Sequence, residues 1–210
     1  IKVINNSSDN LGGGLYFYNG SNINIVNLIS QGNSGKYGPG VNAYGYCYVD
    51  IKNALITDNY AYSSAGGVVS FGYSSISLTN ATVTNNGSNE DDAGLWAGSN
   101  SSIYFNNSIL WGQSVKQSSE TSSVIVSHSI IDGGFDGDAV MSMDPMFVQD
   151  SSGYHLSDAS VGIGYGLDQS PSLSNSVRLR VTDADGNGLS SDINIRIERD
   201  DTNELVHEFY

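Results

Sequence analysis

Two acidic, glycine-containing segments carry the residue types that bind calcium in proteins. The segment DADGNG places Asp183, Asp185 and Asn187 at the first, third and fifth positions of an EF-hand-like loop. Because the twelfth position is Asn194 and not a bidentate Glu, a polar hairpin turn is the favoured interpretation. The segment IIDGGFDGDAVMSMD adds four carboxylates, which are Asp132, Asp136, Asp138 and Asp144. Calcium is the one cofactor that these segments suggest, and solvated loop carboxylates are the favoured alternative.

Cleavage of a polysaccharide would need residues that this sequence does not bring together. Lytic β-elimination requires a base such as Lys or Arg, and hydrolysis requires two carboxyl groups, one of them with a raised pKa. Lys52 and Asp50 share the outward face of an alternating segment, so we predict a surface ion pair between them. The bases available before position 178 are Lys2, Lys36, Lys52 and Lys116. The favoured hypothesis is a non-catalytic protein. The alternative is a polysaccharide lyase or another carbohydrate-active enzyme with catalytic residues partly outside this sequence.

Aromatic side chains recur at outward positions of one predicted strand in each repeat. Leu15 and its equivalents must point into the core, so the residues one and three positions later point outward. The aromatic residues at these positions are Tyr16, Tyr18, Tyr44, Phe71 and Trp96. Sugar rings stack on aromatic faces, which makes this strip a candidate carbohydrate site. Two other interpretations remain open, namely self-stacking that stabilises the sheet and burial under a loop or a neighbouring domain.

A repeat of 26 to 27 residues must position these side chains. Its clearest marker is a glycine followed by an apolar residue, at Gly14-Leu15, Gly40-Val41, Gly67-Val68 and Gly94-Leu95. Each repeat holds three short alternating segments separated by Gly, Asn and Ser, a pattern that is typical of strands. A repeat of this size cannot bury its own apolar face and must stack on its neighbours. The predicted fold is an all-β, right-handed, three-sheet parallel β-helix.

Two asparagine ladders share the same period. The first ladder is Asn27, Asn53, Asn80 and Asn107, and the second is Asn6, Asn33, Asn59 and Asn86, followed by Gln113. Asn tolerates the left-handed conformation that a tight bend between sheets needs, and stacked amides can hydrogen-bond along the axis. We predict both roles for both ladders. A row of ligands for metal or ice is the less favoured alternative. His128 takes the asparagine position in one more, shorter coil at Val124–Gly134.

The repeat region, from residue 1 to about residue 168, resembles a known family, most specifically in its C-terminal part. The segments NSILWG (107–112), HSIID (128–132), DPMFV (144–148), GYHLSDAS (153–160) and GIG (162–164) carry the resemblance. They are similar to the last coils of bacterial right-handed parallel β-helix repeat proteins, which share the pectate-lyase-like fold. The family usually has Ser-Pro where this chain has Ser160-Val161. The resemblance implies a secreted or surface-anchored protein. Members include polysaccharide lyases and epimerases, but a fold alone does not establish a function.

The chain divides into three segments. Residues 1–168 are the predicted β-helix, and residues 169–176 are a predicted linker. Residues 177–210 contain the first arginines of the chain, and their apolar residues alternate at 177–181 and at 193–197. This pattern predicts a β-hairpin that opens an immunoglobulin-like β-sandwich, although about 34 residues are too few to complete one.

Charge and composition restrict the partners. The net charge is −14 and no arginine precedes position 178, which argues against nucleic acid and against an anionic membrane surface. No run of about 18 apolar residues could span a bilayer. The single cysteine, Cys47, excludes an internal disulfide and is predicted to be a packed side chain.

The chain starts inside a repeat, so we expect a piece of a longer protein. We predict a monomeric extracellular or cell-surface rod with an adhesive or structural role, whose partner is a polysaccharide or a surface protein.

Overall fold

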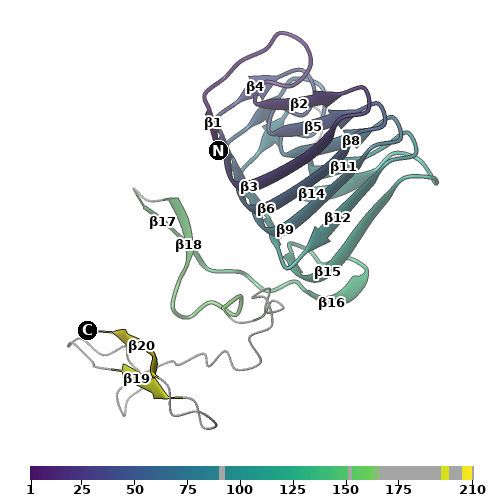
Figure 1. Ribbon diagram of the computed structural model, residues 1–210. Coiled ribbons are helices and arrows are strands. Elements are labelled where there is room, and N and C mark those ends of the chain that lie inside the picture. Colours follow the sequence, from purple (N-terminus) through teal and green to yellow (C-terminus); the bar gives the residue numbers. More distant parts are fainter. Residues whose placement is uncertain (90–92, 151–152, 164, 166–194, 199–204, 210) are drawn as a thin grey trace. The chain divides into compact units, whose positions relative to one another are not determined.

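The computed structural model describes residues 1–89, 93–150, 153–163, 165, 195–198 and 205–209 (Figure 1). All the regular secondary structure in these residues is β-strand. The chain divides into two units, Ile1–Asp168 and Gln169–Tyr210. None of the described residues belongs to a helix that is long and apolar enough to cross a membrane.

The first unit is a parallel β-solenoid of about four turns. Three sheets run along it, as predicted. The first sheet has the order β14 (Ser114–Gln117), β11 (Ala93–Ala97), β8 (Val68–Phe71), β5 (Val41–Tyr44) and β2 (Leu15–Tyr18). The long sheet contains β1 (Lys2–Ile4), β3 (Asn22–Gln31), β6 (Tyr48–Thr57), β9 (Ser75–Thr84), β12 (Ser102–Asn106), β13 (Ile109–Trp111), β15 (Ser123–Ile131) and β16 (Gly137–Met141). The short sheet contains β4 (Ser34–Gly35), β7 (Tyr60–Ala61) and β10 (Gly87–Ser88).

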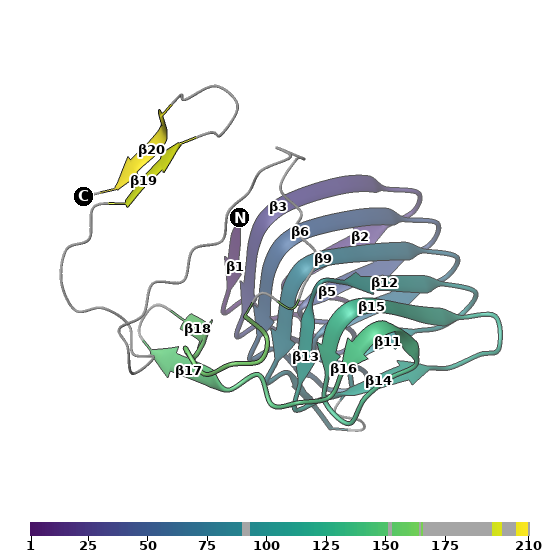
Figure 2. The same ribbon diagram turned by 90° about the horizontal axis from the view of Figure 1, so that it is seen from below.

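The first ladder bends the long sheet. Its four asparagines have φ angles between 53° and 60°, and His128 has a φ of 48°. The amide of Asn53 donates to Asn27 Oδ1 at 3.2 Å, and the amide of Asn80 donates to Asn53 Oδ1 at 3.2 Å. Strands β3, β6, β9 and β15 therefore each cover two faces of the coil, and β3, β6 and β9 lie side by side in Figure 2. Both predicted roles of this ladder, and the position of His128, are confirmed.

The asparagines of the second ladder do not make the bend themselves. Its residues have ordinary φ angles, so the prediction that they occupy the left-handed region is wrong. The left-handed residue is the one before each of them, at Asn5, Gly32, Asp58, Asn85 and Gly112. This position makes the bend and leaves the following side chain pointing into the solenoid. There, Asn33, Asn59 and Asn86 are almost completely buried.

Each buried amide of the second ladder connects three coils. The Asn59 amide donates to Ser30 O of the preceding coil at 3.0 Å and to Asn86 Oδ1 of the next coil at 2.9 Å. Its Oδ1 accepts from the backbone N–H of Asn33 at 3.0 Å and from the Asn33 amide at 2.9 Å. The predicted hydrogen bonds along the axis are thus confirmed. They satisfy backbone groups that would otherwise be buried without partners.

The repeated glycine is required because backbones of adjacent coils approach closely. A Cβ on Gly40 would lie 2.3 Å from Gly67 O, and a Cβ on Gly67 would lie 2.3 Å from Gly94 O. The apolar residue after each glycine points into the core as predicted, since Val41, Val68 and Leu95 are fully buried. The rest of the core comes mainly from the inward positions of the long sheet, and Cys47 is packed within it.

The solenoid ends differently from the repeat pattern. Strand β15 pairs with β12 in parallel, which confirms the shorter coil, and β16 pairs with β15. The next strands, β17 (Phe147–Asp150) and β18 (Gly153–Leu156), form an antiparallel hairpin and do not extend the parallel sheets. In the second unit, β19 (Ile195–Glu198) pairs with β20 (Leu205–Phe209) in antiparallel fashion. A C-terminal hairpin is therefore present, but it pairs Ile195–Glu198 with Leu205–Phe209. The predicted partner strand at residues 177–181 lies outside the described residues.

We predict that Asn59→Ala lowers the free energy of unfolding by about 3 kcal/mol, because the buried backbone N–H of Asn33 and the amide oxygen of Asn86 lose a partner. Asn53→Gly in the first ladder should cost about 1 kcal/mol or less, because glycine adopts a φ of 57° readily. Urea unfolding measures both values. Equal losses in the two variants would contradict this assignment of roles.

Candidate functional site

The outward face of the first sheet has the predicted register. Tyr16, Asn42, Val69 and Trp96 form one row of neighbours across β2, β5, β8 and β11, and Lys116 of β14 continues that row. A second row joins Tyr18, Tyr44 and Phe71. Because the coils stack in register, side chains that are 26 or 27 residues apart become direct neighbours.

Loops of the solenoid cover the centre of this face. Asn42 and Val69 are only 3% and 4% exposed, so the centre is not an open strip. The Asn42 amide donates to Tyr37 O at 3.0 Å, and a Cβ built on Gly38 would lie 3.0 Å from side-chain carbons of Asn42 and Val69. Val69 also packs with Ala65 in a small apolar cluster outside the main core. Burial under a loop, one of the interpretations left open by the sequence, applies to these two central residues.

The space between the sheet and the loops is a cleft, which we call the aromatic cleft. It has a cavity volume of about 200 Å³ and is lined by Leu11, Tyr16, Tyr37, Asn42, Tyr44, Ser64, Val69, Phe71 and Trp96. Four of the five aromatic residues singled out in the sequence thus share one cleft. The fifth, Tyr18, stacks on two of them, with ring centroids 6.0 Å from Tyr16 and 5.9 Å from Tyr44.

The aromatic rings of the cleft are fixed by their neighbours. Phe71 and Trp96 meet edge to face, with centroids 5.1 Å apart. Lys116 Nζ lies 4.7 Å from the Trp96 ring centroid, and Lys36 Nζ lies 5.2 Å from that of Tyr37. Such contacts hold a ring by cation–π attraction and by packing of the lysine stem. Ring orientations are therefore set before any ligand arrives, which lowers the entropy cost of binding.

The Tyr16 hydroxyl is partly desolvated in the cleft. Burial raises the pKa of the Tyr16 hydroxyl above its usual value of about 10, and the nearby phenols of Tyr18 and Tyr44 raise this pKa further. None of the described residues that line the cleft is a carboxylic acid. The polar side-chain groups of the described lining are tyrosine hydroxyls, the Asn42 amide, the Ser64 hydroxyl and the Trp96 indole N–H.

Loop residues of the cleft escaped detection in the sequence. Leu11, Tyr37 and Ser64 lie between strands, where the alternation that identifies outward positions does not apply. The sequence predicts only that the loops before the strands of one sheet lie together at the edge of that sheet. It does not predict which residue of each loop folds back over the sheet.

The carboxylates considered for calcium do not converge. Asp132, Asp136, Asp138 and Asp144 are exposed, and no group of three or more potential metal ligands of the His, Cys, Asp and Glu types is found among the described residues. Asp132 Oδ2 accepts from the backbone N–H of Gly112 at 3.1 Å, and Asp144 Oδ1 accepts from that of Met146 at 2.7 Å. Asp183, Asp185 and Asn187 lie outside the described residues. The predicted ion pair between Lys52 and Asp50 is confirmed at 3.6 Å.

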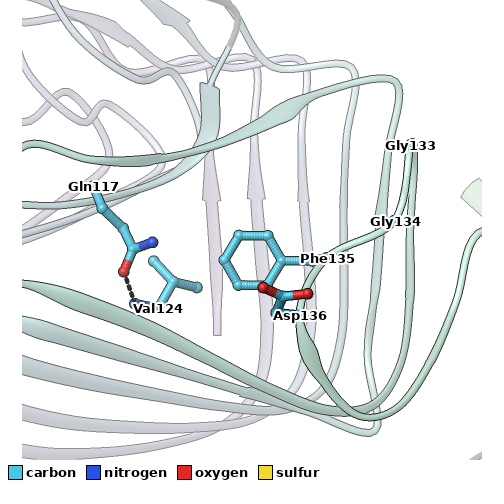
Figure 3. Close-up of a pocket in the computed structure, with 6 residues that line it drawn as sticks. All are labelled: Gln117, Val124, Gly133, Gly134, Phe135 and Asp136. Atoms are coloured by element: carbon cyan, nitrogen blue, oxygen red, sulfur yellow. Dashed lines mark hydrogen bonds between the residues drawn. The ribbon is translucent and has the colours of Figure 1, made fainter.

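A larger and more polar cavity lies near the C-terminal end of the solenoid (Figure 3). Its volume is about 640 Å³, and its lining comprises Gln117, Val124, Gly133, Gly134, Phe135 and Asp136. Gln117 Oε1 accepts from the backbone N–H of Val124 at 3.0 Å, and Phe135 packs against the end of the core. Asp136 is the one carboxylate among the described residues of this lining. A single exposed acid beside glycines forms neither an acid–base pair nor a set of metal ligands.

A third cavity of about 520 Å³ follows the first ladder on the outside of the long sheet. It is lined by Ile1, Lys2, Asn27, Leu28, Ile29, Asn53, Ala54, Leu55 and Asn80. The asparagine amides here are already used in the axial hydrogen bonds that stabilise the bend. The aromatic cleft is therefore the stronger candidate for a ligand site.

No family model, curated protein or solved structure matches this chain.

We predict that Tyr16→Phe reduces the loss of stability at alkaline pH. In the wild type, unfolding lets Tyr16 ionise near pH 10, whereas its raised pKa keeps it protonated in the folded state, so rising pH favours the unfolded chain. The difference in melting temperature between the variant and the wild type should therefore grow from about pH 8 to about pH 11. Tyr48→Phe, at an exposed position outside the cleft, is the control. A difference that stays constant with pH would contradict the burial of this hydroxyl.

Proposed function

We propose that this chain is a non-catalytic extracellular β-helix that binds a neutral polysaccharide in the aromatic cleft. The observation that carries the proposal is the gathering of Tyr16, Tyr44, Phe71 and Trp96 around one apolar cavity. The C–H faces of a sugar ring stack on such aromatic faces, and the surrounding hydroxyls and amides bind its rim. The volume of about 200 Å³ is below the roughly 300–1,000 Å³ of sites for drug-sized ligands and suits one sugar ring of a longer chain.

Charge supports a neutral ligand. The chain carries 22 acidic and 8 basic residues, so its field repels polyanions. Among the described residues, Lys36 and Lys116 are cations near the cleft, and both are engaged with aromatic rings of its lining. A polyanion would thus find a net repulsive field without a dense cationic patch to offset it.

The lining supports binding over catalysis. Hydrolysis of a glycoside needs two carboxyl groups, and β-elimination needs a strong base close to the sugar. The described lining of the aromatic cleft supplies tyrosine hydroxyls, one amide, one serine hydroxyl and one indole N–H. Of the tyrosines, Tyr16 has a raised pKa and is therefore a weaker proton donor at neutral pH, not an activated base.

The wider proposal concerns family and location. We infer that the chain belongs with the bacterial right-handed parallel β-helix repeat proteins of the pectate-lyase-like fold and acts as a secreted or surface-attached adhesive rod. The parallel solenoid and its asparagine ladders support this assignment, together with the segments DPMFV and GYHLSDAS. In the same proposal, residues 177–210 begin an immunoglobulin-like module.

We predict that the double variant Tyr16→Ala/Trp96→Ala weakens polysaccharide binding about tenfold or more, because each lost ring contact contributes about 0.5–1.5 kcal/mol. Affinity electrophoresis in gels that contain hydroxyethylcellulose, xyloglucan or β-mannan measures this change. Tyr104→Ala is the matched control, because Tyr104 is 41% exposed on β12 of the long sheet, outside the cleft. Equal retardation of the wild type and the cleft variant would refute the proposed site.

A further inference from the structure

The turns that follow the strands of the first sheet share an unusual backbone. In each turn two consecutive residues have positive φ, as the central residues of a type I′ turn do. The pairs are Asn19-Gly20 (58° and 76°), Gly45-Tyr46 (81° and 60°), Gly72-Tyr73 (65° and 64°) and Ser99-Asn100 (51° and 60°). Turns of this kind strongly favour Gly, Asn and Asp, because these residues accept positive φ at low cost.

At the second position of these pairs, Tyr46 and Tyr73 are therefore the exceptions. Their equivalents in the outer coils are Gly20 and Asn100, which suit the conformation. A bulky side chain at positive φ is a backbone outlier, and such outliers concentrate at functional sites. Two coils in succession carry this strain in a position where glycine or asparagine would relieve it.

The rings of Tyr46 and Tyr73 contribute little to the stability of the fold. They stack in parallel, with centroids 5.1 Å apart and an angle of 4° between their planes. However, Tyr46 is 61% exposed and Tyr73 is 53% exposed, so neither ring contributes to the core. The left-handed conformation costs two bulky residues more than one exposed ring stack recovers. Stability alone does not explain these tyrosines.

An open place lies next to the stack. The position of the first coil that corresponds to Tyr46 is Gly20, and a Cβ there would have nothing within 4 Å. The face of the Tyr46 ring that points away from Tyr73 is thus free of the side chain that would continue the ladder. A ring supplied by a ligand can stack at this place with the spacing that the two tyrosines already show.

The stack adjoins the aromatic cleft. Tyr44, which lines the cleft, is 47% exposed and is separated from Tyr46 by one glycine. Its Cε2 lies 3.7 Å from where a Cβ of Gly72 would be, so the ring leans over the turn of the next coil. Tyr18 leans over Gly45 in the same way, at 3.8 Å. Exposed aromatic surface therefore continues from the cleft onto the turns.

We propose that Tyr46 and Tyr73 form a second ring-binding platform for a neutral polysaccharide, with one sugar ring stacked on Tyr46 above Gly20. This inference rests on the proposed function, since it extends the bound chain from the aromatic cleft across the edge of the first sheet. The ligand is then a polymer of several sugar units that crosses the turns, and a short oligosaccharide fills the cleft alone.

The test is the double variant Tyr46→Gly/Tyr73→Asn, which installs the residues of the outer coils. Its melting temperature should equal or exceed that of the wild type, because the strain is relieved. Its affinity for hydroxyethylcellulose, xyloglucan or β-mannan should fall at least fivefold, while its affinity for trisaccharides of the same sugars stays unchanged. Tyr104→Ala again serves as the control. All variants are made in the 210-residue chain.

The remaining outcomes distinguish the binding site in the aromatic cleft from the platform of Tyr46 and Tyr73. Unchanged polysaccharide affinity, or a lower melting temperature, overturns the platform, because the tyrosines are then neutral or structural. Loss of binding in the turn variant alone, with the Tyr16→Ala/Trp96→Ala variant unaffected, overturns the cleft and leaves the platform. A wild type that none of the three polysaccharides retards overturns both.

Discussion

The close contact between successive coils is the constraint on which the rest of this structure depends. Parallel strands lie about 4.8 Å apart, so each coil must satisfy its backbone groups against the coils directly before and after it. The glycine before the inward residue of the first three coils is required because a backbone carbonyl of the next coil lies where its Cβ would be. The buried amides of the second ladder are needed because the bends bury backbone N–H and C=O groups away from water, and the amides supply their hydrogen-bond partners. Packing of the apolar core follows from these two requirements.

The same constraint organises the surface. Outward residues of adjacent coils must lie side by side, so two tyrosines in register stack and an aromatic repeated across coils becomes a continuous patch. A glycine in one coil, such as Gly20, leaves an open place in such a row. The rod thus converts a linear repeat into an ordered array of rings, and the loops decide which part of that array is covered and which is accessible.

The fold was predictable from the sequence to the extent that the period enforces it. Alternation determined that Val41, Val68 and Leu95 point inward, because the opposite register would expose the core residues of every coil at once. Prediction failed where two adjacent residues could make the same bend: Asp58 and Asn59 both tolerate positive φ, and only the packed structure assigns the bend to Asp58. The cleft was predicted in part. Its strand residues follow the period, whereas Tyr37 and Ser64 come from loops whose paths depend on packing. The strained tyrosines also escaped attention, since a φ angle leaves no mark in a sequence that is rich in tyrosine.

The second ladder has a mechanical consequence. Because the amide of Asn59 holds a carbonyl of the coil before it and an amide of the coil after it, each buried rung acts as a staple through three layers. An interior coil cannot open unless rungs on both of its sides break together. A terminal coil is released by breaking a rung on one side only. Thermal fluctuations should therefore open such a rod from its ends, and its middle coils, which carry Tyr44 and Phe71 of the aromatic cleft, are the last to lose their shape.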